Sequence, residues 1–135
     1  MIKFVKSWWP SALVLIAVLW LTLAPHPLPD NHIQLFQGAD KIVHALMMGG
    51  LTAVLIFDFR RRKPRHGHIV GIKEVIVIAI CMFCFSALDE WAQGAMAQGR
   101  TADILDFAAD SAGIIIISLA EPLLLNKYYT RHRKD

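Results

Sequence analysis

Several features of soluble enzymes are missing from this sequence of 135 residues. It has no glycine-rich phosphate-binding loop and no Gly-x-Ser-x-Gly turn that would present a nucleophilic serine. It has only two cysteines, and charged side chains make up only 19% of the chain. No internal repeat is visible, and there is no room for a soluble domain outside the apolar runs. The sequence therefore gives no support to a nucleotide-binding enzyme.

Long apolar runs are abundant instead, since 56% of the residues are hydrophobic. Four runs are visible, and each can cross a hydrocarbon core of roughly 30 Å as a helix when its flanks are included. We therefore predict an all-α integral membrane protein, a bundle of four transmembrane helices that forms a single domain over residues 1–135. The predicted spans are residues 8–24, 41–59, 73–93 and 103–124.

The first run has an alternative interpretation as a signal peptide, because two lysines precede an apolar region of suitable length. A cut after Ala24 would fall directly before Pro25, which is a poor cleavage context. Three tryptophans, Trp8, Trp9 and Trp20, are typical of the interfacial anchors of a retained span. We therefore expect this helix to stay in the protein.

The distribution of basic residues predicts the orientation of the bundle. With both termini in the cytoplasm, twelve of the 14 lysines and arginines lie on the cytoplasmic side, and only Lys41 and Arg100 lie outside. The twelve are Lys3, Lys6, Arg60, Arg61, Arg62, Lys63, Arg65, Lys73, Lys127, Arg131, Arg133 and Lys134. We expect a multi-pass protein of the bacterial cytoplasmic membrane. The basic stretch at residues 59–68 is a topological anchor in this interpretation, and we expect no nucleic-acid partner.

Two motifs inside the spans have structural interpretations. Cys81 and Cys84 form a Cys-x-x-Cys pair, but no second pair of ligands accompanies them, so we interpret them as apolar packing residues. Ala45, Gly49 and Ala53 place small side chains on one face of the second span. Such a face allows close approach of another helix in lipid, which we expect to pack there.

The outer ends of the second, third and fourth spans each carry a group of polar side chains. At about 100° per residue, each group falls within a sector of about 100° or less. The groups are Asp40, Lys41 and His44; Asp89, Glu90 and Gln93; and Asp103, Asp106 and Asp110. An ionised aspartate at the centre of a span costs about 2.5 to 3.5 kcal/mol, so these side chains should face each other or water. We predict one polar cavity that opens to the outside.

The charge of this predicted cavity is uneven. Its six carboxylates outnumber its two cations, Lys41 and Arg100, while neutral His44 adds no charge. Like charges and burial both disfavour ionised carboxylates, so either some acids are protonated or cations occupy the cavity. A purely structural alternative is that ion pairs, for example of Lys41 with Asp89 or Glu90, simply hold the bundle together.

Taken in order, these motifs resemble the VanZ-like family, whose pattern is approximately DK..H, DE..Q and GR..D..D...N..G. The matching residues lie between position 38 and about position 117, and this chain has Asp110 where the family pattern has asparagine. They are "DKIVH" at 40–44, "DEWAQ" at 89–93, "GR" at 99–100, Asp103, Asp106 and Gly113.

The resemblance implies a membrane protein of the cell envelope with four transmembrane helices. The name-giving member of the family is associated with low-level resistance to teicoplanin, a lipidated glycopeptide. The resemblance also implies that the matched polar residues form the working site. These are Asp40, Lys41, His44, Asp89, Glu90, Gln93, Arg100, Asp103 and Asp106.

Three functions fit an outward polar site at headgroup depth. The first is binding of a lipid, a lipid-linked envelope intermediate or an amphiphilic, teicoplanin-like compound. The second is a membrane-embedded hydrolase or transferase for a lipid-linked phosphate or glycosyl group, with a divalent metal held by His44, Glu90 and Asp106 as one possible cofactor. The third is ion transport. It is disfavoured because the polar face does not extend through the bilayer: beyond His44 and Asp110 the helices are nearly all apolar until Glu121, which we interpret as a boundary residue.

Overall fold

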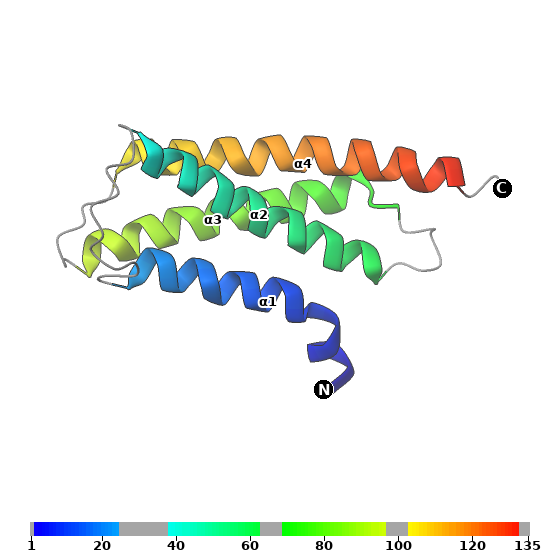
Figure 1. Ribbon diagram of the computed structural model, residues 1–135, viewed down its shortest axis with the longest axis horizontal. Coiled ribbons are helices and arrows are strands. Elements are labelled where there is room, and N and C mark those ends of the chain that lie inside the picture. The colour runs from blue at the N-terminus through cyan, green and yellow to red at the C-terminus, as the bar shows by residue number, and fades with distance from the viewer. Residues whose placement is uncertain (1, 25–37, 63–68, 97–102, 133–135) are drawn as a thin grey trace.

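The computed structural model describes residues 2–24, 38–62, 69–96 and 103–132, and these residues form four α-helices without any strand. The helices are α1 (Ile2–Leu23), α2 (Ala39–Arg61), α3 (Ile72–Ala95) and α4 (Ile104–His132). In Figure 1, α2, α3 and α4 run alongside one another and α1 lies along the bundle. The predicted all-α class is confirmed.

Three of the four helices, α2, α3 and α4, are long and apolar enough to cross a membrane. The apolar part of α1, Trp8–Leu23, is shorter than these. Many large apolar side chains point away from the bundle, such as Leu46, Ile80 and Leu123, which are 69%, 56% and 72% exposed. A surface of this kind is stable only where lipid tails replace water, so the outward faces fit a membrane-embedded bundle.

Every helix contributes to the hydrophobic core at the middle of the bundle. Its buried residues are Val18 of α1, Met48 and Leu51 of α2, Met82 of α3 and Ile114 of α4. The most extensive packing is between α2 and α4. α2 therefore fixes the position of α4 more firmly than that of any other helix.

Glycines bring α2 and α4 close together. A side chain at Gly113 of α4 would overlap the backbone carbonyl of Ala45 on α2. A Cβ atom at Gly49 would lie 3.3 Å from the carbonyl oxygen of Gly113 and from Ile117. Ala45 and Gly49 of α2 thus face α4 of the same chain, where the backbones approach closely because Gly49 and Gly113 carry no side chain.

The two cysteines do not pack inside the bundle. Cys81 and Cys84 are both free and exposed on α3, so they lie on the side that lipid would cover. The prediction that they are packing residues is therefore wrong, because both lie on the surface of the bundle. Trp91, which helix angles place away from the polar sector, is 70% exposed.

Candidate functional site at the acidic end of the bundle

Nine of the predicted site residues lie at one end of the bundle, where α2 and α4 begin and α3 ends. We call this set the acidic end. It consists of Asp40, Lys41, His44, Asp89, Glu90, Gln93, Asp103, Asp106 and Asp110. The tenth predicted residue, Arg100, lies outside the described residues.

Lys41 joins the beginnings of α2 and α4. Its Nζ donates to Asp106 Oδ1 at 2.8 Å, to Asp103 Oδ2 at 3.2 Å and to Asp40 Oδ2 at 3.1 Å. All three hydrogens of the ammonium group can thus be used by carboxylates. The pairing with Asp89 or Glu90 that the structural alternative proposed is not the one observed; the partners of Lys41 come from its own helix and from α4, the helix that packs most closely on α2.

Asp103 lies directly before α4 and caps its first turn. Its Oδ1 accepts a hydrogen bond of 2.8 Å from the backbone N–H of Leu105, which is the arrangement of a helix N-cap. The backbone amide of Leu105, and then Lys41, hold the pKa of the Asp103 carboxyl below its usual value. This carboxylate therefore remains charged in ordinary buffers, and it anchors the first turn of the helix that carries Asp106 and Asp110.

Deeper in the bundle, Asp110 connects three helices. Its Oδ1 lies 3.1 Å from His44 Nδ1 on α2, and its Oδ2 accepts a hydrogen bond of 2.7 Å from Ser86 Oγ on α3. Asp110 and Ser86 are both fully buried. The carboxylate stands between the serine and the imidazole, so His44 is not the partner of Ser86. The order differs from a nucleophilic Ser–His–Asp triad, in which the imidazole stands in the middle.

The third helix presents Asp89 and Glu90 to the same region. Asp89 accepts hydrogen bonds from Thr22 Oγ1 at 2.9 Å and from Gln93 Nε2 at 3.1 Å, so the last turn of α1 also reaches the acidic end. Glu90 is only 7% exposed, and its Oε2 accepts the backbone N–H of Asp103 at 3.0 Å. Its other oxygen, Oε1, is buried and has no hydrogen-bond partner among the described residues.

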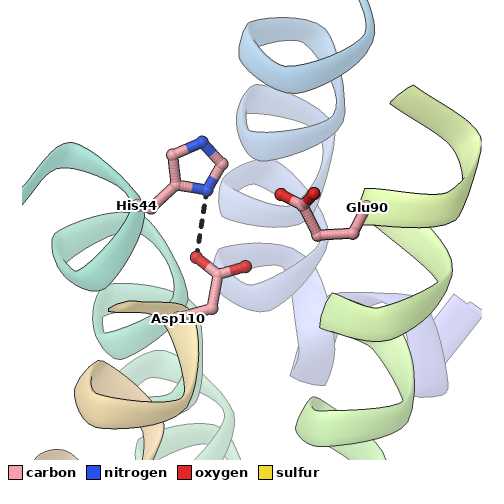
Figure 2. Close-up of side chains that lie close together, drawn as sticks. All are labelled: His44, Glu90 and Asp110. Atoms are coloured by element: carbon pink, nitrogen blue, oxygen red, sulfur yellow. Dashed lines mark hydrogen bonds and ion pairs between the residues drawn. The ribbon is translucent and has the colours of Figure 1, made fainter. Parts of the chain in front are cut away.

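Among the described residues, His44, Glu90 and Asp110 form a cluster whose metal-ligating atoms lie close together. One ligand atom from each residue lies within 4.8 Å of the others. Figure 2 shows the three side chains converging from α2, α3 and α4. The set differs in one member from the predicted one, because Asp106 turns toward Lys41 and approaches His44 Nε2 only to 3.8 Å.

Sequence reasoning missed two partners of the site, Thr22 and Ser86. Both have neutral side chains inside apolar helices, where nothing in the local sequence separates them from ordinary small residues. Position supplied a weak signal: Thr22 lies near the outer end of the first predicted span, and Ser86 lies one turn before Asp89 and Glu90.

A second polar cluster lies at the other end, and we call it the arginine end: Ser11, Asp58, Arg60, Arg61, Glu121 and Asn126. Arg60 is 1% exposed, donates to Asn126 Oδ1 at 2.8 Å, and has its Nε 3.9 Å from Glu121 Oε1. Arg60 was expected in a cytoplasmic connection, but it belongs to α2 and is held between helices. Its neighbour there is Glu121, which we interpreted as a boundary residue.

Asp58 is the other buried charge of the arginine end. Its Oδ2 accepts from Ser11 Oγ at 2.7 Å and from the Ser11 backbone N–H at 3.1 Å, and its Oδ1 lies 3.4 Å from Arg61. A mostly apolar pocket of about 300 Å³ opens nearby between α3 and α4, beside Val75, Ser118 and Pro122. None of its lining residues belongs to the acidic end.

Fold and site together define an all-helical membrane protein whose polar residues gather where the spans begin and end. The model of the VanZ/LLP1 family matches residues 5–125, which is most of the chain. The chain belongs to this family. Neither a search of curated proteins nor a search of solved structures returned a match.

Proposed function

We propose that the acidic end binds the polar headgroup of a lipid, of a lipid-linked envelope compound or of an amphiphilic compound of the teicoplanin kind. The polar residues lie at the ends of helices that are long enough to span a membrane. Large apolar side chains stand beside them on the outer surface, such as Leu46 and Leu88, which are 69% and 63% exposed. A headgroup at the acidic end would leave its apolar chains against these surfaces.

The charge of the acidic end determines which headgroup fits. Lys41 is already surrounded by three carboxylates, and it is the one lysine or arginine of the acidic end within the described residues. Phosphate would therefore meet mostly like charge. The excess of carboxylate oxygens favours groups that donate hydrogen bonds, namely amines and sugar hydroxyls. This excess is the observation that carries the proposal.

The proposal places the acidic end at the outer face of the bacterial cytoplasmic membrane, with both termini inside. The twelve basic residues predicted on the opposite side support that orientation. It can be measured by single-cysteine labelling from outside intact cells, in a background in which Cys81 and Cys84 are replaced. Labelling at position 40 and protection at position 131 are expected, and the reverse pattern would overturn the orientation.

Mass spectrometry of co-purified lipids tests the binding. We expect the purified protein to be enriched in amine- or sugar-bearing lipids relative to the bulk membrane, and Asp106→Asn to reduce this enrichment. Glu74→Gln is the matched control, because it removes one acid from the first turn of α3, outside the acidic end. A lipid profile identical to that of the bulk membrane, in the wild type, would refute headgroup binding.

A second candidate function is hydrolysis or transfer at a lipid-linked phosphate or glycosyl group. The contact of His44 with Asp110 at 3.1 Å, next to buried Glu90, favours it because an imidazole and a carboxylate can share proton-transfer steps. Incubation with radiolabelled lipid-linked phosphate and glycosyl substrates tests it. Turnover that His44→Gln abolishes would support catalysis, and absence of turnover in the folded wild type would count against it.

A further inference from the structure

We propose that His44, Glu90 and Asp110 bind one divalent transition-metal ion, of the class represented by Zn²⁺ and Mn²⁺. The site lies deeper than the exposed carboxylate of Asp40, between three helices (Figure 2). It goes beyond headgroup binding and rests on its own geometry, so it can be tested separately.

The spacing of the ligand atoms would match a single ion if the three side chains moved slightly closer together. Two ligands of one ion can be at most about 4.4 Å apart, which is twice a metal–ligand distance of about 2.2 Å. The three atoms here lie within 4.8 Å of one another, and His44 Nδ1 and Asp110 Oδ1 are 3.1 Å apart. A shift of a few tenths of an ångström, spread over three side chains, would complete the arrangement.

The second oxygen of each carboxylate ligand already accepts an orienting hydrogen bond. Asp110 Oδ2 accepts from Ser86 Oγ at 2.7 Å, and Glu90 Oε2 accepts from the Asp103 backbone at 3.0 Å. The second ring nitrogen of His44 lies 3.8 Å from Asp106 Oδ2. Carboxylate, hydroxyl and backbone groups that contact metal ligands orient these ligands and raise the affinity of the site for the metal.

An independent observation, the environment of one Glu90 oxygen, also points to a bound ion. Glu90 Oε1 is buried and accepts no hydrogen bond from the described residues, although the residue is only 7% exposed. Buried carboxylate oxygens are almost always satisfied, because an unpaired one loses its hydration without compensation. The carboxylate is turned toward His44 and Asp110 in Figure 2, where an ion would supply the partner.

Charge and proton balance are consistent with a divalent ion. Two carboxylates and one neutral imidazole neutralise a 2+ charge. Nδ1 of His44 can bind a metal only without a proton, so the ring would keep its proton on Nε2, the nitrogen that faces Asp106. An imidazole with two carboxylates suits zinc and manganese better than magnesium, which prefers oxygen ligands and retains water.

The experiment measures metal binding by the full chain in detergent or nanodiscs, after removal of metals with a chelator. Equilibrium dialysis with Zn²⁺ and with Mn²⁺ should give one ion per chain. Glu90→Gln should weaken binding at least about tenfold, the lower end of what loss of an orienting group alone costs. The matched control is Asp40→Asn, which removes the same charge from the same end at an exposed position.

Equal loss of affinity in Glu90→Gln and Asp40→Asn would overturn the site, because it would indicate a diffuse electrostatic effect. Binding well below one ion per chain in the wild type would overturn it too. If Glu90→Gln does not fold, pulsed electron paramagnetic resonance of Mn²⁺ in the wild type decides: nitrogen coupling from an imidazole is expected, and its absence refutes the site. Lipid profiles of the same samples show separately whether headgroup binding persists.

Discussion

The two ends of the bundle bury charge in different ways. At the arginine end two arginines face two carboxylates, with Arg60 beside Glu121 and Arg61 beside Asp58. At the acidic end six carboxylates surround one lysine and one histidine within the described residues. The first arrangement balances its charge within the protein, and the second does not.

This difference separates a structural network from a candidate binding site. A buried network whose formal charges balance needs no counter-ion from outside, and breaking it leaves an uncompensated charge. An unbalanced network in a membrane requires a cation, a donor-rich ligand or a neutralised acid, which is why such groups mark functional sites. We therefore expect loss of a charged partner at the arginine end to reduce stability, and neutral replacement of a carboxylate at the acidic end to affect binding more than folding.

The largest effect is expected for Arg60→Ala. It removes the hydrogen bond to Asn126 and the neighbour of Glu121, and so leaves a buried carboxylate uncompensated. The free energy of unfolding should fall by about 3 kcal/mol. SDS titration followed by circular dichroism measures it, and adding Glu121→Gln should recover part of the loss. Near-neutrality of Arg60→Ala would remove the distinction between the two ends.

A substitution in the helix contact between the two ends gives a reference value for the losses of stability that charge substitutions cause. Gly113→Ala should cost about 2 kcal/mol, since its new methyl group would overlap the Ala45 carbonyl and push α2 from α4. Gly50→Ala is the control, because no atom lies within 4 Å of its Cβ position. The same titration should show Gly50→Ala at or above the wild-type stability. Equal losses in both variants would contradict the close helix approach.

A matched pair of serines compares the ends directly. Ser86 and Ser11 each donate to a buried carboxylate at 2.7 Å, but Asp58 keeps the Ser11 backbone N–H and Arg61 when the hydroxyl is removed. Within the part of the chain that the structure describes, Asp110 then keeps only His44. Thermal unfolding should show Ser86→Ala losing about 1.5 kcal/mol and Ser11→Ala less. The opposite order would mean that Asp110 has other compensation.

The smallest effect on stability is expected for Glu90→Gln without metal. The amide oxygen can still accept the Asp103 backbone N–H, and one excess negative charge is removed. The free energy of unfolding should fall by no more than about 1 kcal/mol, the centre of the range for single substitutions. With Zn²⁺ present, the wild type should gain more stability than Glu90→Gln. A large loss for Glu90→Gln in metal-free buffer would assign Glu90 to the structural framework.

Much of the fold follows from the sequence because apolar length and helix angle are local properties. The predicted spans lie within the observed helices except at Ala24 and Asp103, and the exposed position of Trp91 agrees with its angle. The grouping of polar side chains at one end follows from the same arithmetic. The angular argument needs only the period of a helix.

The pairing of these side chains could not be predicted, because it depends on how closely each pair of helices packs. Lys41 contacts α4 because Gly113 brings α4 close to α2, and Asp110 rather than Asp106 therefore faces His44 and Glu90. Arg60 misled sequence reasoning for a related reason. Within a run of three arginines, only the helix packing decides which one turns inward.

The positions of the two polar clusters along the helices determine how thick the apolar layer inside the bundle is. On α1, Ser11 and Thr22 contact opposite clusters, and they are about 16 Å apart along the axis. Asp110 and Glu121 on α4 have the same separation, and no charged residue lies between them. Lipid tails around the protein form a layer of roughly 30 Å. Along the inside of the bundle, a polar group would therefore meet an insulating layer only about half as thick as the surrounding bilayer.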